Sequence, residues 1–304
     1  MKRSNLLTLL CFSLSLSLFF LACNSGKTNQ EDKTSAPEAA PAAAAAKPVK
    51  APDAQGSRRI LFIGNSHTEY YVSIPDLFQE LCRFNHKDIK IEKVVEMGIS
   101  LQDIYKDHKD KVAAACSGTD PDGNFYDYVV LQEKTPVAAN NAEEYKASVK
   151  QYMGEIRKNS PGAVFLVYEV MSPASFDKEK NDYQELYKEM KQTAQAIAGE
   201  NENTKLYRVS DAVNDAYNGK YNYVHLDAGR DRLRFGDNTL HLLNDGGFMA
   251  ATLLYATLFD TAPELPEQMS FSTGTGDNDM PKMQPVKAAV SNPDALLKIA
   301  LDHK

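Results

Sequence analysis

Residues 60–82 read ILFIGNSHTEYYVSIPDLFQELC, and this stretch decides the fold. An apolar run from Ile60 to Ile63 ends abruptly at Gly64, and a helical pattern begins near Ser73. A strand that breaks on glycine and leads into a helix places the residues between them at the carboxyl edge of a sheet, where open α/β sheets bind their ligands. We therefore expect Ser66 at that edge, as a candidate nucleophile if the chain supplies a base.

The chain beyond this stretch alternates between strand and helix patterns. Short apolar runs typical of strands cover residues 59–63, 89–95, 126–131, 163–170 and 205–209. Helical spacing of apolar residues covers 73–84, 101–115, 145–156, 183–197, 247–259 and 293–301. Repeated strand–helix units predict an α/β fold, with a parallel sheet covered by helices on both faces.

The first 22 residues have the pattern of a targeting segment. Lys2 and Arg3 precede an apolar stretch that ends just before Cys23. The length of that stretch is typical of a secretory signal rather than of a membrane-spanning helix. A small residue directly before Cys23 resembles the lipobox of bacterial lipoproteins, although a plain secretory signal is the alternative. The resemblance implies cleavage before Cys23, lipid on its sulfur and a membrane-anchored protein of the cell envelope, on the outer membrane or the periplasmic face.

Two segments follow the signal. Residues 23–56 are rich in Ala, Pro, Lys and Glu and have almost no large apolar side chain. Such a segment cannot bury enough surface to offset the entropy cost of ordering, so we expect a disordered, lipid-anchored linker. Residues 57–304 are long enough for one domain with a sizeable core.

Charge and cysteine content argue against a nucleic-acid partner, a disulfide and a metal site. The formal net charge is −7 for all 304 residues, and cleavage before Cys23 makes it more negative because Lys2 and Arg3 leave. With no basic run, we expect no nucleic-acid partner. Cys82 and Cys116 could form a disulfide in an exported protein, but we favour two buried free thiols. The chain has neither CxxC nor HExxH spacing, so no metal site is expected. The oligomeric state stays open.

Three of the expected strands end in glycine or polar residues. The first ends in Gly64-Asn65-Ser66, the second in Glu96-Met97-Gly98, and the third in Gln132-Glu133. Carboxyl ends of parallel strands share one edge, so Ser66, Gly98 and Gln132 should converge. A nucleophilic hydroxyl beside a glycine N–H and a side-chain amide is the combination that acyl transfer needs, because such donors stabilise the developing oxyanion.

The candidate base is His241. It lies in a loop just before the apolar helix, four residues after Asp237. One loop can therefore present an imidazole to take the Ser66 proton and a carboxylate to orient that imidazole.

These blocks resemble those of the SGNH (GDSL-like) hydrolases, in the variant whose first motif reads GNS. GNSHT at 64–68 is similar to the first block, Gly98 to the second, residues 129–133 to the third, and residues 237–241 to the last. The resemblance implies a flavodoxin-like three-layer α/β/α fold and ester hydrolysis through a seryl intermediate, with no cofactor or metal. It makes Ser66 the nucleophile and His241 the base. Ser66, Gly98 and Gln132 would form the oxyanion hole.

Two positions depart from the family pattern. Gln132 stands where the family usually has Asn, which would place the third oxyanion donor one methylene further out. Three residues separate Asp237 from His241, where the family has two. Either a bulged loop lets Asp237 serve as the acid, which we favour, or a backbone carbonyl holds His241. Asp245 is a weaker candidate for the acid.

Three further residues could line the substrate pocket. Asn65 and His67 flank the serine, and His225 belongs to a polar aromatic loop that could meet a sugar. The sequence therefore predicts an esterase that removes acetyl or similar small acyl groups, plausibly from carbohydrate. The alternative is a catalytically silent lipoprotein that binds a glycan or a partner. A lipase or thioesterase would need a long apolar stripe beside Ser66, and the sequence has none.

Overall fold

The described part of the chain is the predicted domain. A computed structural model describes residues 58–119, 125–172, 180–235, 241–273 and 280–304. The signal and linker predicted for residues 1–56, Cys23 included, lie outside these ranges, and so does Asp237. In the described part no helix is both long enough and apolar enough to cross a membrane.

Five parallel strands form the central sheet. They are β1 (Arg58–Gly64), β2 (Ile89–Val95), β3 (Tyr128–Leu131), β4 (Val164–Tyr168) and β5 (Thr204–Tyr207). Their order is β2-β1-β3-β4-β5, and every neighbouring pair is parallel. This is the flavodoxin-like order, in which the direction of strand addition reverses between β1 and β3, the point where such sheets open a crevice for ligands. The predicted fold class is confirmed.

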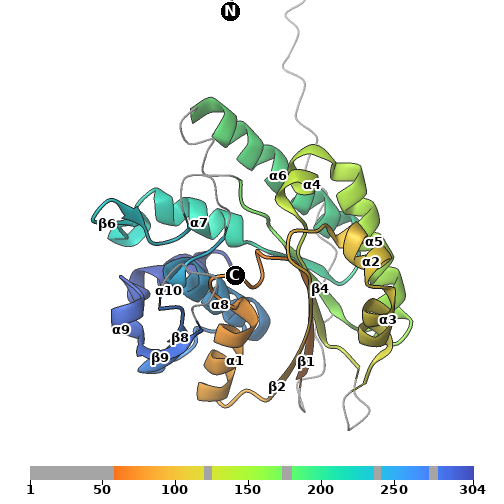
Figure 1. Cartoon of the computed structure of the whole chain (residues 1–304), viewed down its shortest axis with the longest axis horizontal. Coiled ribbons are helices and arrows are strands. Elements are labelled where there is room, and N and C mark those ends of the chain that lie inside the picture. Colours follow the sequence, from red (N-terminus) through yellow and green to blue (C-terminus); the bar gives the residue numbers. More distant parts are fainter. Residues whose placement is uncertain (1–57, 120–124, 173–179, 236–240, 274–279) are drawn as a thin grey trace, which may run out of the picture. The chain divides into compact units, whose positions relative to one another are not determined.

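Helices cover both faces of the sheet (Figure 1). One face carries α1 (Ile74–Phe84), α7 (Val209–Tyr217), α8 (Asn244–Phe259) and α10 (Pro293–Asp302). The opposite side carries α2 (Leu101–Asp107), α3 (Lys109–Ser117), α4 (Thr135–Asn140), α5 (Ala142–Arg157) and α6 (Lys180–Glu200). Smaller elements complete the described part: η2 (Lys220–Asn222), β6 (Leu226–Asp227), β7 (Arg230–Asp231), β8 (Gln268–Phe271), β9 (Lys282–Pro285) and α9 (Val286–Ala289).

Local signals explain where the helices begin and break. Ser73 caps α1 by accepting a hydrogen bond from the Asp76 N–H, as expected for a serine that precedes an Ile-Pro helix start. The single helix expected over 101–115 is instead two helices, because His108 adopts a non-helical backbone (φ −119°, ψ 39°) between them. The short helices α4 and α7 and the β8–β9 hairpin have too few periodic residues to be recognised from sequence.

The core lies between the sheet and its two helix layers. Every residue of β4 is buried, as expected for a strand covered on both faces. Cys82 on α1 and Cys116 on α3 are both buried and free. They belong to helices on opposite sides of the sheet (Figure 1), and burial raises the pKa of the Cys116 thiol to about 12. The favoured prediction of two buried thiols is confirmed.

A close glycine contact packs α8 against the loop that follows β1. A Cβ atom on Gly247, in the first turn of α8, would lie 2.5 Å from Cγ1 of Val72. Real Cβ atoms do not approach so closely, so only glycine permits this packing. The contact matters because Val72 belongs to the loop that carries Ser66, and α8 directly follows the segment that carries His241.

We predict that Gly247→Ala lowers the free energy of unfolding by about 1–3 kcal/mol, because the added methyl overpacks against Val72. The control is Gly154→Ala in α5, where an added Cβ meets nothing within 4 Å. That change should be neutral or should stabilise by up to about 1 kcal/mol, the helix propensity of alanine over glycine. Urea unfolding measures both. Equal stability of the Gly247→Ala variant and the wild type would contradict the packing argument.

Candidate active site

Ser66 and His241 meet at the carboxyl edge of the sheet. The Ser66 Oγ and the His241 Nε2 lie 2.9 Å apart, although the two residues are 175 positions apart in the chain. This distance is within the reach of a nucleophile and its general base. For the serine hydroxyl to donate, Nε2 must be unprotonated and Nδ1 must carry the ring proton. The pair predicted from the sequence is therefore brought together in geometry suited to proton transfer.

A short antiparallel pairing holds the backbone of His241. The Phe235 N–H donates to the His241 carbonyl at 3.0 Å, and the Leu243 N–H donates to the Leu233 carbonyl at 2.8 Å. Arg234, in the same segment, is almost fully buried and donates from Nη1 to the Ser172 carbonyl and from Nε to the Tyr217 hydroxyl. The buried guanidinium of Arg234 thus ties the backbone next to His241 to the core. Sequence reasoning missed Arg234, because one arginine among several in the RDRLRF segment carries no signal of burial.

The turn after β1 is organised around Asn65. Its backbone carbonyl accepts from the Thr68 N–H, and its Oδ1 accepts from the His67 N–H at 3.3 Å. Its Nδ2 donates to the Ile99 carbonyl at 3.0 Å. Asn65 is 1% exposed, so it shapes the turn and links it to the loop after β2. These contacts give Asn65 a structural role in the turn that carries Ser66.

Gln132 braces the same turn from β3. Its Oε1 accepts from the Asn65 N–H at 2.7 Å and from the Thr68 hydroxyl at 3.0 Å. Its Nε2 donates to the Glu133 carbonyl, and its side chain is fully buried. The Asn65 N–H can only donate and the Glu133 carbonyl can only accept, so these two partners fix the orientation of the Gln132 amide. These contacts give Gln132 a bracing role, and they offer no support for the oxyanion-donor role predicted from its position.

Gly64 lets the Gln132 side chain reach the turn. A Cβ atom on Gly64 would lie 2.6 Å from the Gln132 Oε1 and 2.7 Å from the Thr68 Oγ1. The glycine at the end of β1 is therefore required by the close approach of the amide.

Glu133 links the β3 end to the loop after β2. Its Oε1 accepts from the Leu101 N–H at 3.1 Å and from the Lys134 N–H at 2.6 Å. The side chain is fully buried, and burial raises the pKa of its carboxyl to about 7. From the sequence, Glu133 was recognised only as one of the polar residues that end the third strand. Together with Asn65 and Gln132, it ties the ends of β1, β2 and β3 to one another.

Two backbone N–H groups fit the role of oxyanion donors. Gly98 lies in the loop after β2 with a φ of +74°, a conformation that favours glycine, and it is exposed. Within the part of the chain that the structure describes, neither the Gly98 N–H nor the Ser66 N–H has a hydrogen-bond partner. Both groups are therefore available to a substrate oxygen.

His67 and His225 occupy different surroundings. His67 is buried, with its Nε2 2.8 Å from the Thr135 Oγ1 and its ring centroid 5.8 Å from that of His241. It belongs to the wall of the site. His225 packs its ring edge-on to Tyr217 at 4.8 Å, and its carbonyl accepts from the Arg232 N–H. Neither contact of His225 involves Ser66 or His241, so its place in the pocket stays a prediction.

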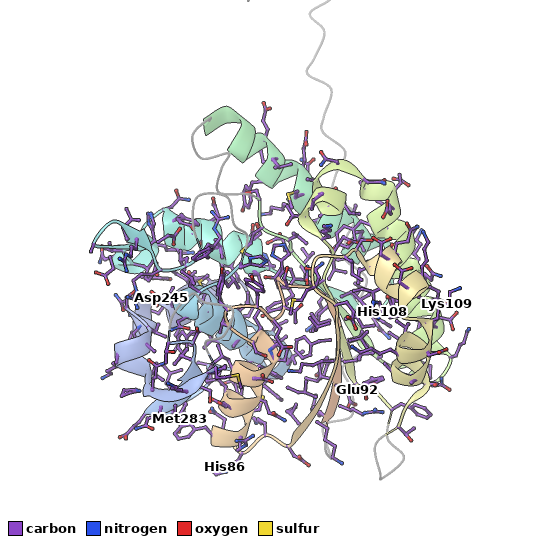
Figure 2. All side chains as sticks on the ribbon, viewed as in Figure 1. His86, Glu92, His108, Lys109, Asp245 and Met283 are labelled. Carbon is purple, nitrogen blue, oxygen red and sulfur yellow. The ribbon has the colours of Figure 1, made fainter. Side chains whose placement is uncertain are left out.

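Asp237 and Asp245 are the two candidates for the acid of a triad, and the structure describes only Asp245. Asp237, the favoured one, lies outside the described residues, so its role stays a prediction. Asp245 is fully buried at the start of α8 (Figure 2). Its carboxylate accepts from the Tyr223 hydroxyl at 2.7 Å, from Arg232 at 3.3 Å, and from the Ser291 N–H at 3.1 Å. These partners make Asp245 a structural hub, and they argue against the weaker suggestion that it orients His241.

Burial lowers the pKa of His241 below its ordinary value of 6.5. The imidazole is therefore neutral at neutral pH, which is the form that can accept a proton from Ser66. The environment favours a base over a permanently charged residue.

Comparison with known proteins shows likeness in structure and none in sequence. No protein-family model matches the chain, and no curated protein matches it in sequence. The crystal structure of a DUF4886 family protein from Bacteroides uniformis superposes with a TM-score of 0.59 at 16% identity, covering 81% of this chain and 94% of that one. A putative SGNH hydrolase from Slackia heliotrinireducens gives 0.49 at 21% identity, covering 67% of this chain and all of that one. A lipase/acylhydrolase from Enterococcus faecalis gives 0.49 at 15% identity, with 69% and 100% covered. The chain shares its fold with the first of these.

We predict that Gln132→Met lowers the free energy of unfolding by about 1–3 kcal/mol, because it leaves the buried Asn65 N–H without an acceptor. Labelling of Ser66 by a fluorophosphonate should slow in the same variant, since the turn loses its brace. Urea unfolding and labelling kinetics measure the two effects. Slower labelling with unchanged stability would instead make Gln132 an oxyanion donor with no bracing role.

We also predict that the labelling rate falls as the pH is lowered, with a midpoint below 6.5. Protonation of His241 removes the base, and burial shifts that protonation to lower pH. The Glu133 carboxyl titrates nearby, with a pKa raised to about 7, so Glu133→Gln is the control. The acidic limb should persist in that variant. A midpoint above 6.5, or loss of the limb in Glu133→Gln, would contradict the assignment to His241.

Proposed function

We propose that this protein is a serine ester hydrolase of the SGNH type that removes small acyl groups, acetyl above all, from carbohydrate. The observation that carries the proposal is the 2.9 Å separation of the Ser66 Oγ and the His241 Nε2. The backbone N–H groups of Ser66 and Gly98 make no hydrogen bond in the described part of the chain, so they can donate to an oxyanion.

The reaction follows from these groups. The Ser66 Oγ bonds to the carbonyl carbon of the ester while its proton passes to the His241 Nε2. The carbonyl oxygen becomes an oxyanion, which the two N–H groups stabilise. The carbon–oxygen bond to the alcohol then breaks, and His241 returns the proton to the leaving alcohol. Water then attacks the carbonyl carbon of the seryl ester while His241 takes its proton. The bond from that carbon to the Ser66 Oγ breaks, His241 returns the proton to the Oγ, and the carboxylic acid leaves. These reaction steps use neither a metal nor a cofactor.

Support for a small acyl group on a sugar is chemical. Ser66 lies within the turn that Asn65 and Thr68 close, and the sequence offers no long apolar stripe beside it for a fatty chain. Aromatic side chains Tyr70 and Tyr71 lie on the same loop, next to the base, and flat rings of this kind can pack against the apolar faces of sugars.

The location is part of the proposal. We propose that the chain is exported, lipidated on Cys23 and held at the cell envelope, on the outer membrane or the periplasmic face, by residues 23–56 as a tether. The support is the lipobox-like sequence at residues 21–23 and the composition of the segment that follows.

One observation favours a second candidate function. Gln132 occupies the position of an expected oxyanion donor, yet its amide is committed to the turn. A scaffold with a weakened oxyanion hole could serve as a silent binding lipoprotein for a glycan or a protein partner, since fold does not determine function.

Labelling with a fluorophosphonate separates the two functions. We predict that mass spectrometry finds the adduct on Ser66 in the wild type. Ser66→Ala should abolish labelling, and His241→Ala should slow it by about 10³-fold or more, because the base is lost. Asp237→Asn reports on the undescribed acid: a large loss supports a triad, and a small one supports a Ser–His dyad. Well-folded wild-type protein without an adduct would favour the silent binder.

A further inference from the structure

Tyr70 stacks on the candidate base. The centroid of its ring lies 4.4 Å from that of the His241 imidazole, and the two planes are inclined by 30°. The two rings form a tilted stack, and their separation is shorter than that of the His241 ring from His67 or from Tyr71. Sequence reasoning did not single out Tyr70, because a tyrosine in a polar loop has no distinguishing pattern.

The backbone holds Tyr70 firmly for a residue that is 44% exposed. Its N–H donates to the Val72 carbonyl, and Glu69 and Ser73 on either side form a bridge across the loop. The Lys93 Nζ contacts the Glu69 carboxylate at 2.9 Å and so ties this loop to β2. These contacts fix the backbone of the loop that presents the Tyr70 ring to the imidazole.

A second ring backs the stack. Tyr71 meets Tyr70 edge-on at 4.5 Å and packs against Phe235 at 4.7 Å. Phe235 is the residue whose N–H donates to the His241 carbonyl. The two tyrosines therefore connect the loop of the nucleophile to the segment of the base.

The face of an aromatic ring attracts a cation within about 6 Å of its centroid. His241 becomes such a cation when it takes the Ser66 proton, in a site where burial opposes the charge. We propose that Tyr70 is a positioning residue: it holds the His241 imidazole toward Ser66 and stabilises the positive charge that the imidazole gains. The inference rests on the proposed function, in which His241 is the base.

The surroundings of His241 identify what else could set its titration. From the loop after β1 it faces His67 at 5.8 Å, Tyr70 at 4.4 Å and Tyr71 at 6.0 Å between ring centroids, and it contacts the Ser66 hydroxyl. Phe235 adds an uncharged ring through Tyr71. Among the described residues whose rings face His241, His67 is the other one that can carry a positive charge, so its NMR signal has to be followed separately.

The test is the titration of His241 by NMR in the full chain, with nitrogen-labelled imidazoles and the signal assigned through His241→Gln. The chain has six histidines, so the signals can be resolved one by one. Tyr70→Leu keeps bulk over the imidazole but removes the ring. Because the ring stabilises the charged form, its loss should lower the midpoint of His241 by about 0.5–1 pH unit. Tyr70→Phe keeps the ring and should leave the midpoint unchanged.

Two comparisons guard the result. Tyr71→Leu, which removes the more distant ring, should shift the midpoint less than Tyr70→Leu does. Tyr70→Met replaces Tyr70→Leu if the latter does not fold. An unchanged or raised midpoint in the ringless variant, or an equal shift in Tyr71→Leu, overturns the proposal.

Labelling kinetics add a functional readout. Above the midpoint, Tyr70→Leu should slow fluorophosphonate labelling of Ser66 about three- to tenfold, and Tyr70→Phe should not. The NMR midpoint can be measured whether or not Ser66 reacts. A wild-type protein that takes no label therefore refutes the proposed function, whereas an unshifted midpoint refutes only the role of Tyr70.

Discussion

The site depends on a set of hydrogen bonds that tie three strand ends together. Gln132 after β3 holds the turn after β1 through the Asn65 N–H. Asn65 in turn donates to Ile99 in the loop after β2, and Glu133 accepts from Leu101 at the end of that loop. All three bracing side chains are essentially buried, where an unmade hydrogen bond is costly. The turn that carries Ser66 and the loop that carries Gly98 therefore cannot shift independently of each other.

His241 is positioned by packing contacts, not by these hydrogen bonds. His241 comes from the segment before α8, which packs on the nucleophile loop through Gly247 and Val72. Arg234 anchors the same segment to the core, and Tyr70 stacks on the imidazole from the nucleophile loop. The 2.9 Å contact between Ser66 and His241 thus results from packing around both residues, as preorganised catalysis requires.

Sequence reasoning succeeded where the signal is local and failed where it depends on distant partners. The strand–glycine–helix pattern located Ser66 at the carboxyl edge of the sheet, and the parallel arrangement of the strands placed Gly98 and Gln132 at the same edge. The role of Gln132 could not be foreseen, because amide orientation depends on which groups lie within reach in the folded chain. Tyr70 and Arg234 were missed for the same reason. Tyr70 contacts His241, and Arg234 contacts Ser172, and in both cases the partner is far away in the sequence.

The central claim is that Ser66 is a nucleophile whose transition state is received by the Ser66 and Gly98 N–H groups. A crystal structure of the fluorophosphonate adduct measures this directly. The account predicts phosphorus bonded to the Ser66 Oγ and one phosphoryl oxygen about 2.7–3.1 Å from both nitrogens, with the His241 Nε2 facing the adduct. An adduct whose phosphoryl oxygen points to solvent, with neither nitrogen in reach, would contradict it.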